Sequence, residues 1–160
     1  MTQQLSSVHR VRAALSEAGI NAEIKEFPAS TRTAQDAASA IGTSVGQIVK
    51  SLVFLAGDSP VLALMSGSNQ LDLARLSALT GATIRKADAE AVRSATSFAI
   101  GGVPPVGFPA PIPTFIDKDL LQYDRIWAAA GTPRHVFRLT PSALARLTGG
   151  SVCDLRVSAP

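Results

Sequence analysis

Hydrophobic residues recur at intervals of three and four positions in several stretches of the chain. Residues 8–18, 34–41, 73–79 and 141–147 follow this pattern, which places apolar side chains on one side of a helix. Thr33 is a suitable N-cap residue before the second stretch, and Pro141 stands at the first helical position of the fourth. The sequence therefore predicts helices in these stretches, and a further helix over residues 88–97.

Other stretches have the alternation or the short apolar runs that are typical of β-strands. Residues 20–27 alternate between apolar and polar side chains, and residues 51–56 and 61–66 flank the turn sequence Gly57-Asp58-Ser59-Pro60, which predicts a hairpin. Further strands are expected at residues 114–117, 125–130, 136–139 and 152–157. Because helices and strands are interspersed without a regular βαβ repeat, we predict an α+β fold with a mixed or largely antiparallel sheet. A single domain over residues 1–160 accounts for the length of the chain.

Lys50 stands inside the apolar run from Ile48 to Phe54. An ammonium group among strand-forming residues is costly to desolvate, so it requires an anionic partner or a route to water. The structural interpretation is a strand-end residue whose stem packs while its head reaches solvent. The functional interpretation is an ammonium group that holds a phosphate or carboxylate at the mouth of a pocket. Strand alternation places Lys50 and Ser51 on opposite faces.

A glycine-proline loop follows later in the chain, from Ile100 to Phe108. Glycines that are free to take unusual backbone angles can turn backbone N–H groups toward a ligand. The same composition is typical of an ordinary surface connection. Taken together, Lys50 and this loop indicate a cation and backbone donors that face one anionic or carbonyl-bearing ligand.

The composition removes several classes of site. One cysteine and two histidines are too few for a protein-only zinc site, and the sequence has no serine-centred elbow, Walker loop or dinucleotide-binding motif. We therefore expect neither a metal nor a cofactor. Asp117 and Cys153 have ordinary structural explanations, as a turn-capping carboxylate and a buried inert thiol, and a site role for Asp117 is the secondary interpretation. The net charge of +3 is permissive for nucleic acid without indicating it. No signal peptide or membrane-length apolar run is visible, so a reducing cytoplasm is the expected location.

Three segments of the chain occur in an order and at a separation that are typical of one family. They are Thr33-Ala34-Gln35-Asp36-Ala37-Ala38 with Ile41-Gly42, then Gln47-Ile48-Val49-Lys50-Ser51-Leu52-Val53-Phe54, then Ile100-Gly101-Gly102-Val103-Pro104-Pro105-Val106-Gly107. With these segments the chain resembles, over almost its whole length, the YbaK/prolyl-tRNA-synthetase-associated editing domain family of freestanding aminoacyl-tRNA deacylases. The resemblance implies a compact α+β fold around a curved, barrel-like sheet. It also implies hydrolysis of the ester that joins a wrong amino acid to the 3′ end of tRNA.

The resemblance also implies site residues. The lysine that matches Lys50 is the key polar residue of the family's pocket, and the loop that matches residues 101–105 lines the place of the aminoacyl group. The implied catalytic residues are Lys50, Gly101 and Gly102, and the implied substrate-binding residues are Val103, Pro104 and Pro105. Ser51 and His135, where the chain departs from the better-known relatives, are further substrate-binding candidates. Ser51 replaces an asparagine that alanine-specific relatives tend to have. His135 begins the stretch in which cysteine-specific relatives carry an aspartate, so the amino acid that is removed stays open.

Our leading hypothesis is a trans-acting aminoacyl-tRNA deacylase that positions the ester and a water molecule, with help from the substrate's own ribose hydroxyl or α-amine. One alternative is a non-catalytic module of the same fold that binds an aminoacyl or nucleotide end through Lys50. Another is a hydrolase of free, small aminoacyl esters. The expected partner is the acceptor end of mischarged tRNA, with an aminoacyl-tRNA synthetase as a second candidate and no membrane.

Overall fold

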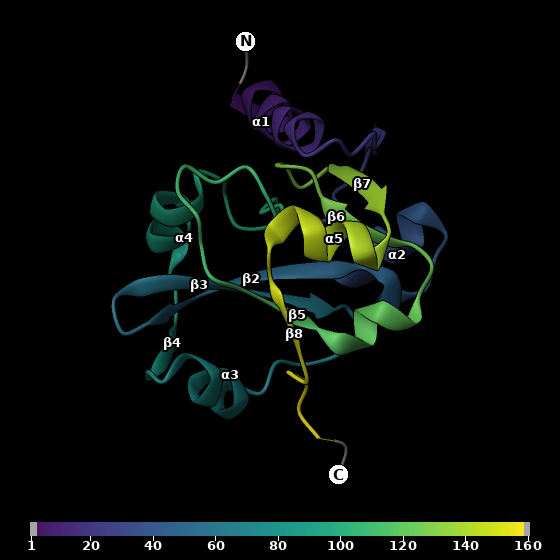
Figure 1. The fold of residues 1–160 in the computed structure, drawn as a ribbon. Coiled ribbons are helices and arrows are strands. Elements are labelled where there is room, and N and C mark those ends of the chain that lie inside the picture. The colour runs from purple at the N-terminus through teal and green to yellow at the C-terminus, as the bar shows by residue number, and fades with distance from the viewer. Residues whose placement is uncertain (1–2, 159–160) are drawn as a thin grey trace.

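The computed structural model describes residues 3–158 (Figure 1). Its helices are α1 (Gln3–Glu17), α2 (Ala34–Ile41), α3 (Leu73–Thr80), α4 (Ala89–Thr96) and α5 (Pro141–Thr148), with the short 3-10 helices η1 (Val45–Gln47) and η2 (Lys118–Gln122). Its strands are β1 (Ile24–Glu26), β2 (Val49–Ala56), β3 (Ser59–Ser66), β4 (Ile84–Lys86), β5 (Thr114–Asp117), β6 (Ile126–Ala129), β7 (His135–Leu139) and β8 (Ser151–Cys153).

The strands of the described residues form two sheets. The larger sheet has the strand order β4-β2-β3-β5-β8, and the smaller one has the order β1-β7-β6. In the larger sheet, β2 and β3 are an antiparallel hairpin with Lys50 opposite Met65, whereas the pairs β3–β5 and β5–β8 are parallel. The smaller sheet is antiparallel throughout. The predicted α+β class, with a mixed sheet and surrounding helices, is therefore confirmed.

The two sheets approach each other where β2 begins. A single bridge links Ile48, just before β2, to Trp127 in β6. In the described residues this bridge does not close the sheets into a barrel. The family resemblance implied a barrel-like sheet, and the structure instead has two sheets that meet along one side. The junction places the start of β2, and with it Lys50, beside β6.

Local sequence signals explain the boundaries that were predicted. The side-chain oxygens of Thr33 and Thr140 accept hydrogen bonds from the first turns of α2 and α5, at 3.0 and 3.1 Å, which satisfies backbone donors that the helix leaves free. Gly42 ends α2 in the left-handed conformation. Ser44 and Gln47 form a capping box that leads the chain into β2.

Two strand predictions differ from the structure, and one strand was not predicted. The alternation in residues 20–27 yields only the three-residue β1, and the expected strand at 152–157 is replaced by β8, which ends at Cys153. Beyond β8 the backbone of Leu155 and Val157 pairs with the loop before α3 instead. The strand β4 was not predicted, because a three-residue edge strand with only Ile84 half-buried carries no recognisable period.

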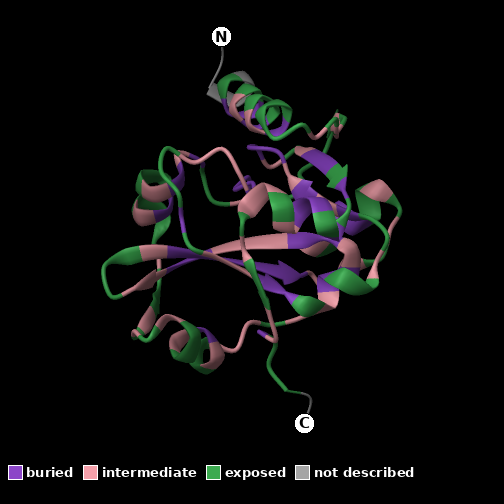
Figure 2. Cartoon of the chain, in the orientation of Figure 1, coloured by how far each residue is buried: buried purple, intermediate pink, exposed green. Residues whose placement is uncertain are grey.

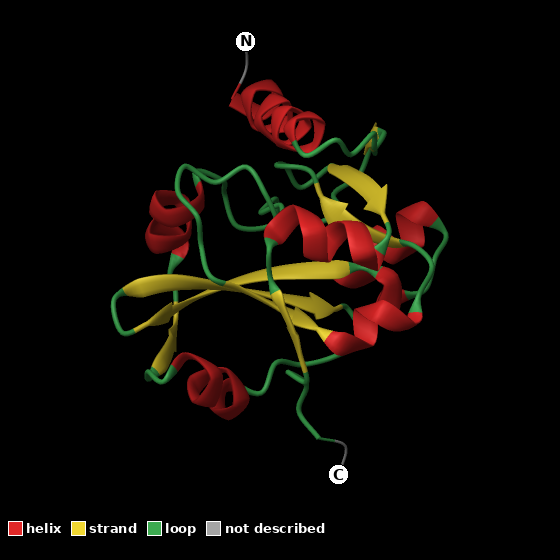
Figure 3. Ribbon diagram, in the orientation of Figure 1, coloured by secondary structure: helices red, strands yellow, loops and turns green. Residues whose placement is uncertain are grey.

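Both faces of the β2–β3 hairpin are buried (Figure 2). Val53 and Leu62 face the main core, whereas Phe54 and Met65 face a second apolar cluster. Figure 3 shows α4 and α3 on opposite sides of this hairpin, where each helix covers one of the two clusters. Two-sided burial explains the long apolar run around Lys50, and it leaves the ammonium group in need of polar surroundings. Within residues 3–158, no helix combines the length and apolarity that crossing a membrane requires.

Candidate active site

A pocket of about 380 Å³ lies where β2, the start of α2, the glycine-proline loop and β6 meet. We call it the Lys50 pocket. Four of the predicted site residues line it, namely Lys50, Ser51, Gly101 and Val103, together with Thr31, Arg32, Thr33, Ala34, Ala37, Ile48, Val49, Leu52, Ile100, Trp127, Ala128, Ala129 and Val136. The fold therefore brings the lysine and the loop to one site, as the sequence predicted. Most of the lining is apolar, so the few polar groups in it stand out.

Lys50 is half-buried on β2 and lines the pocket, and its ammonium group is held by Asn69, a residue outside the lining. Its Nζ donates a hydrogen bond to the backbone carbonyl oxygen of Asn69 at 2.5 Å. Burial lowers the pKa of Lys50 below its ordinary value, and the negative charge of Asp117 opposes this shift. The ammonium group is therefore partly desolvated and fixed in place, which suits a group that must interact with a negatively charged or polarised ligand atom.

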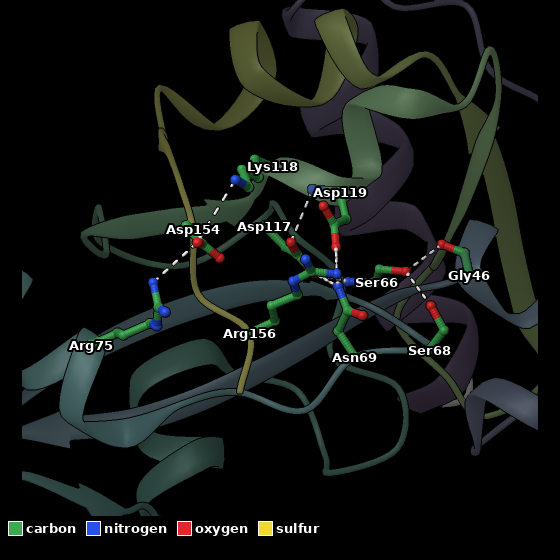
Figure 4. A network of polar contacts seen from close by, with 10 residues as sticks. All are labelled: Gly46, Ser66, Ser68, Asn69, Arg75, Asp117, Lys118, Asp119, Asp154 and Arg156. Carbon is green, nitrogen blue, oxygen red and sulfur yellow. Dashed lines mark hydrogen bonds and ion pairs between the residues drawn. The ribbon is translucent and has the colours of Figure 1, made fainter. Parts of the chain in front are cut away.

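Asp117 organises the polar network beside Lys50 (Figure 4). The residue is fully buried, and its Oδ2 accepts hydrogen bonds from the backbone N–H of Ser66 at 3.0 Å and from the side-chain amide of Asn69 at 2.8 Å. Its Oδ1 accepts from the backbone N–H of Asp119 at 3.0 Å. The Asp119 carboxylate binds the same Asn69 amide at 2.9 Å and pairs with Arg156 at 3.2 Å. The residue whose carbonyl holds Lys50 is thus itself held by two carboxylates.

Ser51 contributes a second polar group to the Lys50 pocket, from the opposite face of β2. Its hydroxyl oxygen is buried and has no hydrogen-bond partner in the described residues. Gly101 and Val103 lie beside it in the lining. A buried hydroxyl without a partner costs about 1–3 kcal/mol, and rotation of the Ser51 side chain toward a polar ligand atom would recover that free energy.

The glycine-proline loop divides into residues that reach the pocket and residues that support it. Gly101 has φ +96, which strongly favours glycine, and a Cβ there would lie 2.7 Å from Nε of Arg32. Gly102 is buried, its N–H donates to the carbonyl of Ala99 at 3.1 Å, and a Cβ there would lie 2.7 Å from the backbone of Thr132. The backbone donor of Gly102 is therefore engaged in a turn. Pro104 and Pro105 are buried behind the pocket and do not line it.

His135 lies outside the Lys50 pocket, at the start of β7. Its Nδ1 shares a hydrogen bond with Oγ1 of Thr132, and its Nε2 lies 3.5 Å from Oε2 of Glu26. Burial lowers the pKa of His135, whereas Glu26 raises it. Its ring nitrogens are thus turned to groups that do not line the pocket, and contact with substrate stays a prediction.

The Lys50 pocket also contains a charged residue that was not predicted from the sequence. Arg32 lines the Lys50 pocket and was not predicted, because an exposed arginine in a polar loop looks like any surface residue. Its guanidinium forms no ion pair in residues 3–158.

Burial raises the pKa of the Cys153 thiol, which fits the inert thiol that we expected. No group of three metal-ligating side chains lies together in the described part of the chain.

Comparison with known proteins places this geometry in a family. The model of the aminoacyl-tRNA editing domain matches residues 28–147. A solved structure described as "a putative trans-editing enzyme for prolyl tRNA synthetase" is 50% identical, with 99% of each chain covered and a TM-score of 0.92. The "Putative Cys-tRNA(Pro)/Cys-tRNA(Cys) deacylase EbsC" of Enterococcus faecalis is 28% identical over 77% of this chain and 76% of its own length.

Part of a much larger enzyme is also similar. The "Proline--tRNA ligase" of Nitratidesulfovibrio vulgaris is 32% identical over 62% of this chain, which corresponds to 18% of that ligase. The region matched by the family model contains the whole lining of the Lys50 pocket. The chain belongs to the aminoacyl-tRNA editing domain family.

Proposed function

We propose that this protein is a trans-acting aminoacyl-tRNA deacylase, which hydrolyses the ester of mischarged tRNA in the cytoplasm as a single-domain enzyme. Membership of the editing family supports the substrate class. The 50% identity to a structure described as a trans-editing enzyme supports action on tRNA that a synthetase has already released. Two of the similar proteins have names that refer to prolyl-tRNA synthetase or to tRNA(Pro), and one of these names also refers to tRNA(Cys). We propose mischarged tRNA(Pro), the tRNA to which both names relate, as the preferred substrate.

The observation that carries the proposal is the combination of groups in the Lys50 pocket. An apolar cavity holds one fixed ammonium group, one buried hydroxyl without a partner, and one glycine loop. An aminoacyl ester is already activated, so the protein need only position it, stabilise the developing oxyanion and admit a water molecule. This set of groups suits that task.

Each group then has a role in the proposed reaction. Lys50 binds the oxygen atoms of the terminal ribose or phosphate, and the backbone N–H of Gly101 orients the ester carbonyl. Ser51 pairs with a polar atom of the aminoacyl group, and Arg32 neutralises phosphate at the rim. The attacking water is deprotonated with help from the substrate's own ribose hydroxyl or α-amine. Gly102 and the two prolines hold the loop in shape, since the N–H of Gly102 is already bonded to Ala99.

The walls of the pocket set the limits of amino-acid selection. Ile48, Leu52 and Val103 are apolar, and an apolar pocket distinguishes side chains that differ by one methylene by only about 1–3 kcal/mol. A separate editing step, after the synthetase has attached the amino acid to tRNA, overcomes this limit on discrimination. The amino acid that is removed must therefore be found by experiment.

The decisive experiment is a panel of mischarged tRNAs, tRNA(Pro) included, incubated with wild type and with Lys50→Ala. We expect wild type to clear at least one member, and the variant to lose roughly 100-fold or more in kcat. Lys118→Ala is the matched control, since Lys118 pairs with Asp154 at 3.7 Å on the surface. The proposal fails if wild type leaves the whole panel intact while a reference deacylase clears it. Binding without turnover by wild type would instead indicate the non-catalytic module.

A further inference from the structure

A second pocket adjoins the Lys50 pocket and has a different character. It has a volume of about 310 Å³ and lies between β7, the segment around β1 and the end of α2. We call it the Arg138 pocket. Its lining is Asn21, Ala22, Glu23, Lys25, Phe27, Ala40, Ile41, Trp127, Val136, Phe137 and Arg138. Trp127 and Val136 line both pockets, so the two share a wall.

The register of the smaller sheet explains why these residues converge. Lys25 lies opposite Val136, and Trp127 lies opposite Arg138. Directly opposed residues of antiparallel strands share a face, and so do residues two apart in one strand. Lys25, Trp127, Val136 and Arg138 therefore point to the same side of the sheet. Phe137 between them points into the main core.

The two cations on this face are not paired with a carboxylate in the described residues, although Glu23 lines the same pocket. Neither Lys25 nor Arg138, both exposed, forms a salt bridge or a side-chain hydrogen bond in residues 3–158. Trp127 between the pockets is half-buried and packs against Ala37 and Ile48. The Arg138 pocket thus offers two free cations beside an indole ring that is held in place.

Cations beside a fixed aromatic ring are the groups that recognise an unpaired nucleotide, because the cations bind phosphate and the ring stacks on the base. Glu23 and Asn21, which also line the pocket, add an acceptor and an amide. A carboxylate can accept a hydrogen bond from the exocyclic amine of cytosine. In every tRNA, a cytidine precedes the terminal adenosine that carries the amino acid.

We propose that the Arg138 pocket binds this penultimate cytidine, with Trp127 stacking on its base and Lys25 and Arg138 binding its phosphates. The proposal rests on the proposed function, in which the Lys50 pocket holds the aminoacyl-adenosine end. The shared wall lets one phosphodiester link nucleosides in the two pockets. The protein thereby binds the last two nucleotides of its substrate. Contacts with so few phosphates require few cations, which is consistent with the modest net charge of +3.

The test compares a double variant, Lys25→Gln with Arg138→Gln, against wild type on two substrates. One is mischarged tRNA and the other is the same amino acid on adenosine alone. We expect kcat/KM for tRNA to fall roughly tenfold or more, and kcat/KM for aminoacyl-adenosine to be unchanged. The matched control is Arg93→Gln with Arg146→Gln, which removes two exposed positive charges from α4 and α5 and should alter neither value. An unchanged value for tRNA, or an equal loss on both substrates, overturns the proposal.

A binding measurement separates this proposal from the proposed function. Trp127 is the single tryptophan of the chain, so its fluorescence reports occupancy without any turnover. We expect the dinucleotide cytidylyl-adenosine to quench it at concentrations roughly tenfold lower than adenosine does, and the double variant to lose that difference. Equal quenching by the two ligands in wild type overturns the cytidine site, even if the deacylase reaction is confirmed. Failure of wild type to hydrolyse either ester would count against the proposed function alone.

Discussion

Asp117 shows how one buried side chain prepares the Lys50 pocket. Both of its oxygens accept hydrogen bonds, from Ser66, Asn69 and Asp119, and Asn69 in turn accepts the bond from Lys50. The carboxylate therefore fixes the residue that fixes the ammonium group. A carboxylate suits this position because every neighbour within hydrogen-bonding distance is a donor.

The Asp117→Asn substitution tests this arrangement. It replaces one acceptor oxygen by an NH₂ group that must face donors, so we expect the free energy of unfolding to fall by about 3 kcal/mol. Urea unfolding measures the change. Asp154→Asn is the matched control, because Asp154 pairs near the surface with Arg75 at 3.1 Å and Lys118 at 3.7 Å, and such pairs contribute about 1 kcal/mol or less. Equal losses in the two variants would contradict the view that the hydrogen bonds of Asp117 contribute more to stability than a surface ion pair does.

The same variant has a predicted effect on the pH dependence of activity. The charge of Asp117 raises the pKa of Lys50 against the lowering by burial, so its removal lowers that pKa further. If the charged ammonium group is required, the loss of kcat/KM on the alkaline side moves to lower pH in Asp117→Asn than in wild type. An alkaline limb at the same pH in both proteins would argue against an essential Lys50 charge.

At the scale of single elements, the glycine-proline loop depends on the backbone of Gly101. We expect Gly101→Ala to lower the free energy of unfolding by about 1–2 kcal/mol, because its positive φ is unfavourable for alanine. Gly42→Ala, at φ +83 with nothing within 4 Å of a new Cβ, should be affected similarly. Only Gly101→Ala should lose activity, since its Cβ would displace Arg32 and alter the pocket. Unfolding curves and kcat/KM values together decide this, and equal activity of the two variants would contradict it.

Elements whose signals are local could be predicted from the sequence. The hairpin turn at Gly57 to Pro60, the cap at Thr33 and the capping box at Ser44 depend on a few adjacent residues, and each is present. The strand β4 depends instead on pairing with β2, and its own three residues carry no pattern. The element that was not predicted is therefore one whose formation depends on pairing with a strand far away in the sequence.

The same division applies to the candidate site. Lys50 and Gly101 were identified because a charge in an apolar run and a glycine in a rigid loop are visible locally. Asp117 was predicted as a turn cap and does cap η2 through Asp119, but its bonds to Ser66 and Asn69 were not predicted, because these partners lie far away in the sequence. Ser51 lines the same pocket as Lys50 although strand alternation separates their side chains, and the alternation pattern alone did not predict this.

At the scale of the whole molecule, His135 couples stability to pH. It begins the central strand of the smaller sheet, facing Thr132 and Glu26, with the positive charges of Arg134 and Arg12 nearby. Burial, as the largest cause, lowers its pKa below the ordinary 6.5. As the pH falls through 6.5, the unfolded chain therefore takes up a proton before the folded protein does, and this difference destabilises the fold.

We therefore expect the free energy of unfolding of wild type to fall between pH 7.5 and about 5.5, and to fall less steeply in His135→Gln. Denaturant unfolding at several pH values measures both slopes. The absolute stability of His135→Gln can differ through the lost contact with Thr132, so the slopes of the two curves are compared rather than their absolute values. His9→Gln, which removes the exposed histidine of α1, is the matched control. Parallel curves for wild type and His135→Gln would show that His135 takes up its proton equally in the folded and unfolded chains, and that burial in the smaller sheet does not govern its charge.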